Sequence, residues 1–147
     1  MVTRDRYGGY AQLRKGRVSI RNQAYHVTSA TLDRAPIFTK LVLGRAIVGA
    51  FRREHEAGHV ESLAFVVMPD HFHWLVTLVG SRALSVTVNT VKSFSARGIN
   101  RIRGTSGAVW QTGFHDRAIR RDEDLAGVAR YIVANPLRSG IVRSVGE

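Results

Sequence analysis

The sequence predicts an α+β domain in which an antiparallel β-sheet is covered on one face by helices. The periodicity of apolar residues changes along the chain in the order strand, helix, strand, strand, helix, strand, and a further helix follows. Only Pro69 and Asp70 separate the second and third strands, so these two strands should form a hairpin. A length of 147 residues with 44% hydrophobic residues is sufficient for one domain with a packed core.

The first strand and the first helix lie in the first half of the chain. Residues 24–31 alternate between apolar and polar positions, as a half-buried strand does. One face of this strand would carry Tyr25, Val27 and Ser29. Thr39 is predicted to cap a helix that runs to about residue 57, and Gly58 should end it. The apolar side of that helix would consist of Leu41, Leu43, Ile47, Val48 and Phe51.

The hairpin and the second helix occupy the middle of the chain. Residues 60–68 and 71–79 have the composition of strands. Residues 83–102 have the spacing of a helix. Two extended segments, 109–111 and 114–119, follow a glycine-containing loop, and the second of them supplies the fourth strand.

The last predicted helix begins near a cluster of acidic residues. Asp122 is a plausible N-cap, and Glu123 and Asp124 suit the positive end of a helix dipole. Pro136 limits the helix, which should end at residue 134 or 135. The complete order of elements is that of the ferredoxin-like or RRM-like fold, with an added C-terminal helix. The sheet face without helices would then be open to a ligand.

The charge of the chain indicates a polyanionic partner. Its 22 Lys and Arg residues outnumber 11 Asp and Glu residues and give a net charge of +11. Residues 1–22 form a predicted basic arm in front of a domain that spans residues 23–147. The absence of cysteine excludes disulfides and thiolate metal sites. No apolar run reaches the roughly 20 residues of a transmembrane helix, so a cytoplasmic protein is expected.

Two histidines on one strand form a candidate metal site. His71 and His73 are two residues apart, so both point to one face of the sheet while Phe72 points to the other. Two adjacent imidazoles can bind a divalent cation. Tyr131 and Asn135 are one helical turn apart and supply a candidate nucleophile and a candidate third ligand. In so basic a chain, this combination predicts phosphodiester cleavage in nucleic acid.

Four segments of the sequence carry a resemblance to a known family. These are residues 25–28, 67–75, 109–117 and 131–142. In this order they resemble the HUH single-tyrosine transposases of the insertion-sequence type, and more closely the REP-associated tyrosine transposases. The resemblance implies that His71, His73 and Asn135 bind Mg²⁺ or Mn²⁺. It also implies that Tyr131 attacks the scissile phosphate and forms a 5′-phosphotyrosine intermediate.

The family resemblance further implies a substrate of single-stranded DNA next to a hairpin. The protein would be nucleoid-associated and would act as a monomer or a homodimer. Candidate DNA contacts in the basic arm are Arg4, Arg6, Arg14, Lys15 and Arg17. Candidate contacts in the domain are Arg97, Arg101, Arg103, His115, Arg117, Arg120 and Arg121.

Other functions are also compatible with the sequence. The same sheet could bind single-stranded or hairpin nucleic acid without chemistry, although the paired aromatic motifs of the RNA-recognition fold are missing. A histidine-triad hydrolase would need another histidine where Leu75 stands, and a 2H phosphoesterase would need two His-x-Thr/Ser motifs. Structural roles are also open for single residues: Asn135 could be a helix C-cap before Pro136, and Asp70 could serve only the turn.

Overall fold

The computed structural model describes residues 20–120 and 124–134. Nothing is described of Asn135, Arg121 or most of the predicted arm. The predicted arm contacts at Arg4, Arg6, Arg14, Lys15 and Arg17 therefore also lie outside the described residues. The division of the chain at residue 22 stays a prediction.

Four strands and three α-helices make up the regular structure of the described residues. In chain order the elements are β1 (Ala24–Ala30), the 3₁₀ turns η1 (Leu32–Arg34) and η2 (Ile37–Thr39), α3 (Leu41–Glu56), β2 (Val60–Met68), β3 (His71–Leu78), α4 (Leu84–Arg103), β4 (His115–Ala118) and α5 (Leu125–Val133). The strands form one antiparallel sheet in the order β2-β3-β1-β4. This arrangement confirms the predicted α+β fold with its C-terminal helix.

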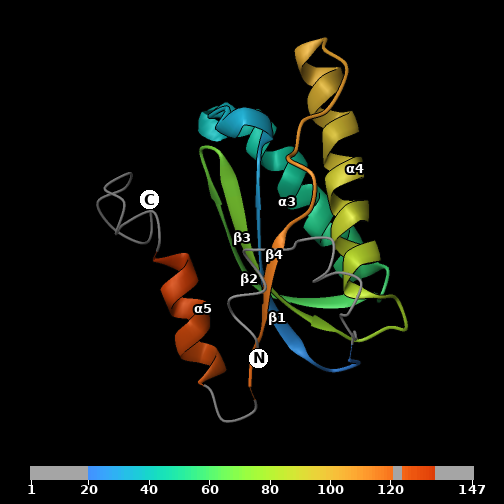
Figure 1. The fold of residues 1–147 in the computed structure, drawn as a ribbon, viewed down its shortest axis with the longest axis vertical. Coiled ribbons are helices and arrows are strands. Elements are labelled where there is room, and N and C mark those ends of the chain that lie inside the picture. The colour runs from blue at the N-terminus through green and yellow to red at the C-terminus, as the bar shows by residue number, and fades with distance from the viewer. Residues whose placement is uncertain (1–19, 121–123, 135–147) are drawn as a thin grey trace.

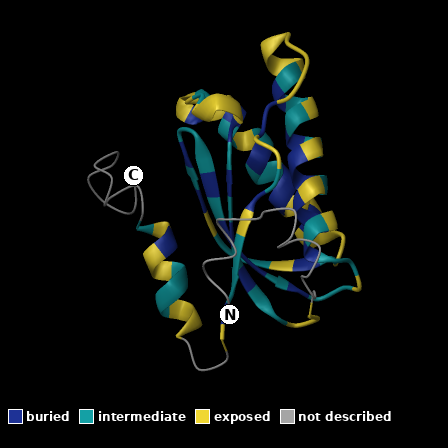
Figure 2. Ribbon diagram, in the orientation of Figure 1, coloured by how far each residue is buried: buried dark blue, intermediate teal, exposed yellow. Residues whose placement is uncertain are grey.

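Helices lie on both sides of the sheet, as Figure 1 shows: α3 and α4 on one side and α5 on the other. On the α3 and α4 side, aromatic rings from strands and helices pack together. The Phe51 ring of α3 stacks on Trp74 with a centroid distance of 4.5 Å and meets Phe72 edge-on at 5.1 Å. Trp110 contacts the other side of Phe72 at 5.4 Å. The main core therefore lies between the sheet and these two helices, where buried residues concentrate (Figure 2).

We predict that Phe72→Ala destabilises the protein by about 3–5 kcal/mol, because this ring is fully buried between Phe51 and Trp110. Urea unfolding followed by circular dichroism measures the change. Val86→Ala is the matched control, because Val86 is 48% exposed on α4 and its loss should change stability by no more than about 0.5 kcal/mol. Equal effects of the two substitutions would contradict this assignment of the core.

The second side of the sheet is not wholly open, which corrects the prediction of an uncovered ligand face. Ile132 of α5 packs with Leu75 of β3 and with Val66 and Met68 of β2 in a smaller apolar cluster. The amphipathic character of α5 explains this position, because its apolar residues are buried only if the helix lies on the sheet. The C-terminal helix thus crosses the face that carries the paired histidines.

The two ends of α3 give different outcomes for the predicted boundaries. Gly58 has φ +82°, and the N–H groups of Gly58 and His59 donate to His55 and Glu54, which is the predicted glycine end of the helix. At the start, Thr39 is not the cap: its hydroxyl donates to the Pro36 carbonyl at 3.1 Å, and Lys40 occupies the N-cap position.

Two further predictions for the helices were wrong. Leu41 was expected on the apolar side of α3, but its side chain is 69% exposed. The reason is that Leu41 lies in the first turn of α3, at the edge of the main core. The last helix begins after Asp124 and not after Asp122, so Asp124 is its N-cap residue, although its side chain makes no capping hydrogen bond. In the described part of the chain, no helix is long and apolar enough to cross a lipid bilayer.

Candidate active site

The hairpin turn before β3 is held in place by the segment that follows β1. The Asp70 carbonyl accepts hydrogen bonds from the Thr31 N–H at 2.9 Å and from the Thr31 hydroxyl at 3.1 Å. The Pro69 carbonyl accepts from the Phe38 N–H at 3.0 Å. Because both turn carbonyls are bonded, the start of β3 and the histidine that begins it have a defined position.

One face of the central strands is polar, and strand register decides its membership. His73 lies opposite Thr28 of β1, which in turn lies opposite His115 of β4. His26 lies opposite Arg117. Directly paired residues of antiparallel strands point to the same face. We call this set the polar face; it comprises His26, Thr28, His71, His73, His115 and Arg117. The intervening Phe72 is buried on the other side, as predicted.

A carboxylate orients the first of the paired histidines. Nδ1 of His71 lies 2.7 Å from Oδ1 of Asp70, and the other oxygen of Asp70 accepts from Nε of Arg34 at 2.9 Å. Partial burial opposes ionisation of Asp70, but the hydrogen bonds from His71 and Arg34 outweigh it and lower the pKa of the carboxyl below its ordinary value. Asp70 is therefore a carboxylate at neutral pH, and it holds a proton on Nδ1 of His71.

An imidazole and a hydroxyl group orient the second histidine. Nδ1 of His73 lies 3.0 Å from Nε2 of His26 and 3.1 Å from the Thr28 hydroxyl. The rings of His71 and His73 are 5.0 Å apart between centroids and nearly perpendicular. Since Nδ1 of each ring is bonded to protein atoms, each imidazole would bind a cation through Nε2.

The donor chemistry of this pair fits a divalent cation, but the pair is not a complete site. Within residues 20–120 and 124–134, no three His, Cys, Asp or Glu side chains are grouped so as to hold a metal ion. A third protein ligand would have to come from elsewhere, and the predicted one, Asn135, immediately follows the last described residue. Nδ1 hydrogen bonds to a carboxylate and to other protein groups are typical of metal-binding histidines.

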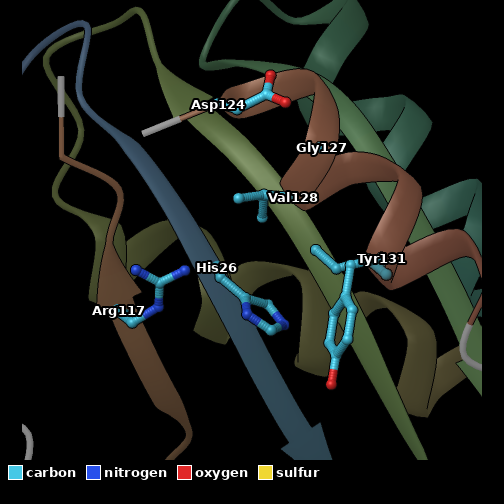
Figure 3. A pocket seen from close by; sticks show the side chains of 7 residues that line it. His26, Arg117, Asp124, Gly127, Val128 and Tyr131 are labelled. Atoms are coloured by element: carbon cyan, nitrogen blue, oxygen red, sulfur yellow. The ribbon is translucent and has the colours of Figure 1, made fainter. Parts of the chain in front are cut away.

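The candidate nucleophile lies beside this polar face, on α5. Tyr131 is 63% exposed and lines a pocket of about 500 Å³ together with His26 and Arg117. In Figure 3 the phenol ring hangs from α5 next to the His26 imidazole, and the Arg117 guanidinium lies on the opposite side of His26. The remaining lining residues are Asp124, Gly127, Val128 and Ile132. The Arg117 guanidinium, the Tyr131 hydroxyl group and the His26 imidazole, which contacts His73, therefore surround one pocket.

The predicted DNA contacts do not all lie near this pocket. His115 and Arg117 belong to the polar face. Arg120 lines a separate pocket with Arg21 and Leu125. The basic residues of α4 lie in the layer across the sheet, since α4 packs on the Phe72 side. These are Arg97, Arg101 and Arg103. They cannot share one phosphate with the histidine pair, so they are not part of the same site.

Two positioning groups were missed from the sequence: Asp70 and Thr28. Asp70 was interpreted mainly as a turn residue, and its position directly before His71 was the available signal. His26 lies in the first predicted strand, within the motif of residues 25–28. Its alternation with Tyr25 placed it on the polar side of β1, but its contact with His73 depends on a pairing between strands 47 residues apart.

Comparison with known protein families assigns the chain to one of them. The model of the family described as "Transposase IS200 like" matches residues 19–135. The chain belongs to the IS200-like transposase family. The matched segment contains the complete polar face, Tyr131 and Asn135. The family resemblance predicted from the motifs is thereby confirmed.

Individual relatives agree with this family. A curated Haemophilus influenzae protein, whose name assigns it to the REP-associated tyrosine transposases, is 28% identical over 108 residues, which cover 67% of this chain and 61% of that protein. The chain thus spans less than two thirds of that relative. A solved REP-associated tyrosine transposase bound to a REP hairpin has a TM-score of 0.67 and 25% identity, over 88% of this chain and 75% of its own.

A second solved structure shares the fold of this chain. It is a Deinococcus radiodurans protein described as a transposase, with a TM-score of 0.58 and 22% identity. The match covers 80% of this chain and 93% of that protein. At this identity the likeness concerns the fold alone.

Proposed function

We propose that the protein is a metal-dependent single-stranded DNA endonuclease and strand transferase that acts at hairpin-forming repeats. The observation that carries this proposal is that Tyr131 shares a pocket with His26, whose imidazole contacts His73 of the histidine pair. The hairpin bound to the solved relative supports the choice of substrate. Such an enzyme would be cytoplasmic and nucleoid-associated, and we expect it to act as a monomer or a homodimer.

The side chains divide the work of binding the scissile phosphate. His71 and His73, with Asn135 as the expected third ligand, would hold Mg²⁺ or Mn²⁺; when bound, this cation supplies charge that polarises a non-bridging phosphate oxygen. Arg117 can donate to a second phosphate oxygen from the other side of the pocket. The phosphate would thereby be oriented toward the Tyr131 hydroxyl.

The proposed chemical step is a transesterification. The Tyr131 oxygen forms a bond to phosphorus, and the bond between phosphorus and the 3′ oxygen breaks. The phenolic proton leaves to solvent, and the departing 3′ oxygen takes a proton from solvent and becomes a 3′-hydroxyl. The product is a 5′-phosphotyrosine, whose retained ester bond allows another 3′-hydroxyl to be joined by the reverse step without ATP.

A covalent-adduct assay tests this function. The purified chain is incubated with labelled DNA that contains a hairpin and single-stranded flanks, in Mg²⁺ or Mn²⁺, and is run on a denaturing gel. We expect a labelled band at the mass of protein plus DNA fragment. Salt-sensitive DNA binding without any adduct, with several hairpins and both metals, would overturn the proposal.

A second candidate is a hairpin-binding protein without catalytic activity. It is favoured by one observation: within the described residues, no three His, Cys, Asp or Glu side chains are grouped so as to hold a metal ion. The basic composition would serve binding equally well. The same adduct assay distinguishes the two candidates.

The Asp70 carboxylate should matter for metal affinity. We predict that Asp70→Asn weakens Mn²⁺ binding by roughly 10–100-fold, because it removes the charge that holds the Nδ1 proton of His71. Titration calorimetry with Mn²⁺ measures the change. Asp33→Asn is the matched control, since Asp33 is exposed and its φ of +55° is well tolerated by Asn. Equal affinities of both variants would remove Asp70 from the site.

The arginines on the two sides of the sheet should differ in their effects. We predict that Arg117→Gln reduces the slope of log affinity against log salt by about 0.7, as expected for the loss of one contact to single-stranded phosphate. The same change at Arg101, across the sheet on α4, should leave this slope unchanged. Fluorescence anisotropy at several salt concentrations measures the slopes. An equal change of slope in both variants would contradict this placement of the DNA.

A further inference from the structure

His26 lies between the histidine pair and the tyrosine pocket. Its Nε2 is 3.0 Å from Nδ1 of His73, and the two ring centroids are 5.1 Å apart. The same imidazole lines the pocket with Tyr131 of α5 and lies opposite Arg117 of β4. The structure thus provides a direct contact from β1 to the side chain that would bind the cation.

The chemistry of two bonded imidazoles restricts where their protons can be. A hydrogen bond between two ring nitrogens requires one donor and one acceptor. If His73 binds a cation through Nε2, its remaining proton must be on Nδ1, so Nδ1 donates. His26 must then accept at Nε2 and keep its own proton on Nδ1. The reverse arrangement would put the His73 proton on Nε2, where it would block the cation.

The two histidines of the pair are held by groups of different charge. His71 is held by the Asp70 carboxylate, whereas His73 is held by the His26 imidazole and the Thr28 hydroxyl. A carboxylate in place of His26 would line the pocket where the scissile phosphate is expected, and two negative charges at short range repel each other. A neutral acceptor can orient His73 without this repulsion.

We propose that His26 is a positioning residue: a neutral acceptor that holds the metal-binding tautomer of His73 and leaves the pocket able to receive a phosphate. This inference rests on the proposed function, because it concerns the cation and the phosphate of that reaction. It assigns His26 no contact with the reacting atoms. Its consequence is that acceptor strength at position 26 controls cation binding, whereas charge at position 26 controls DNA binding.

Three substitutions in the full-length chain separate these two effects. His26→Leu removes the acceptor, and we expect Mn²⁺ binding to weaken by roughly 10–100-fold. His26→Gln supplies a neutral acceptor and should bind Mn²⁺ within about threefold of the unmodified protein. His26→Glu supplies a charged acceptor and should keep Mn²⁺ binding but lose at least about tenfold in affinity for hairpin DNA. Electron paramagnetic resonance of free Mn²⁺ measures the first quantity, and fluorescence anisotropy measures the second.

Two controls keep a failure of this inference distinct from a failure of the proposed function. His55→Leu alters an exposed histidine on α3 and should change neither quantity. His71→Ala should abolish Mn²⁺ binding if the histidine pair holds the cation. If His71→Ala loses Mn²⁺ while His26→Leu binds as the unmodified protein does, the role of His26 is overturned and the nuclease remains. If His71→Ala also binds Mn²⁺ normally, both are overturned.

A measurement on the unmodified protein covers the case in which His26→Leu does not fold. Nitrogen-15 NMR of the imidazole rings, with Zn²⁺ as a diamagnetic probe, reports which ring nitrogen carries each proton. We expect the His73 proton on Nδ1 and no proton on Nε2 of His26. A proton on Nε2 of His26 in the Zn²⁺-loaded protein would overturn the proposal.

Discussion

Tyr131→Phe is expected to abolish the covalent protein–DNA adduct and to reduce strand cleavage by more than roughly 10³-fold. The substitution removes a single oxygen atom, and that oxygen is the proposed nucleophile. Tyr131 is 63% exposed on α5, so the loss of its hydroxyl should not disturb the core. Affinity for hairpin DNA should stay within about threefold, since the phosphate-binding side chains are unchanged. Denaturing gels with end-labelled DNA measure the adduct, and fluorescence anisotropy measures the binding.

Tyr25→Phe is the matched control for this prediction. Tyr25 is buried on the opposite face of β1, where its hydroxyl accepts a hydrogen bond from the Ile20 N–H at 3.2 Å. Its substitution removes the same atom but should leave adduct formation intact. An adduct that persists in Tyr131→Phe and is lost in Tyr25→Phe would show that Tyr131 is not the nucleophile. Adduct formation in both variants would mean that another group attacks the phosphate.

The second large effect concerns the histidine pair. His71→Ala should lower cleavage by at least about 10³-fold, because it removes one cation ligand and leaves Asp70 without its imidazole partner. Salt-sensitive DNA binding should persist, since it depends on the basic residues of the chain. The same loss should follow when EDTA removes divalent cations from the unmodified protein. Single-turnover cleavage, with and without added Mn²⁺, measures both effects.

His55→Ala serves as the control for the loss of an imidazole. His55 is exposed at the end of α3, on the other side of the sheet, where its Nδ1 accepts from the Ser62 N–H at 3.1 Å. It should cleave DNA at the normal rate. Cleavage that survives both His71→Ala and EDTA would eliminate the role of a metal ion and leave the phosphotyrosine chemistry to be explained without it.

Local patterns in the sequence were enough to predict the elements near the site. The alternation in residues 71–74 puts Phe72 in the core and both histidines on the other face, because a strand has no other way to direct adjacent side chains. The two-residue connection at Pro69 and Asp70 can only join neighbouring antiparallel strands. The left-handed Gly58 ended α3 as predicted. All of these features depend on contacts between residues close in sequence.

Helix starts were predicted less well than helix ends. Several polar residues precede α3 and α5, and each of them could serve as an N-cap. Thr39 bonds to Pro36 instead, and the last helix begins after Asp124 instead of Asp122. The choice among such residues depends on where the helix axis lies on the sheet, and that position is set by the burial of Ile47, Phe51 and Ile132.

By itself, the sequence determined the order of the elements, the orientation of the histidine pair and membership of the transposase family. These follow from short-range periodicity and from motifs that are read directly along the chain. Only the tertiary structure decided that α5 covers part of the polar side of the sheet, that Asp70 and His26 hold the two histidines, and that the α4 arginines face away. The physical reason is that strand register and helix docking are settled by side chains far apart in sequence, as with His26 and His73, which meet only when β1 and β3 pair.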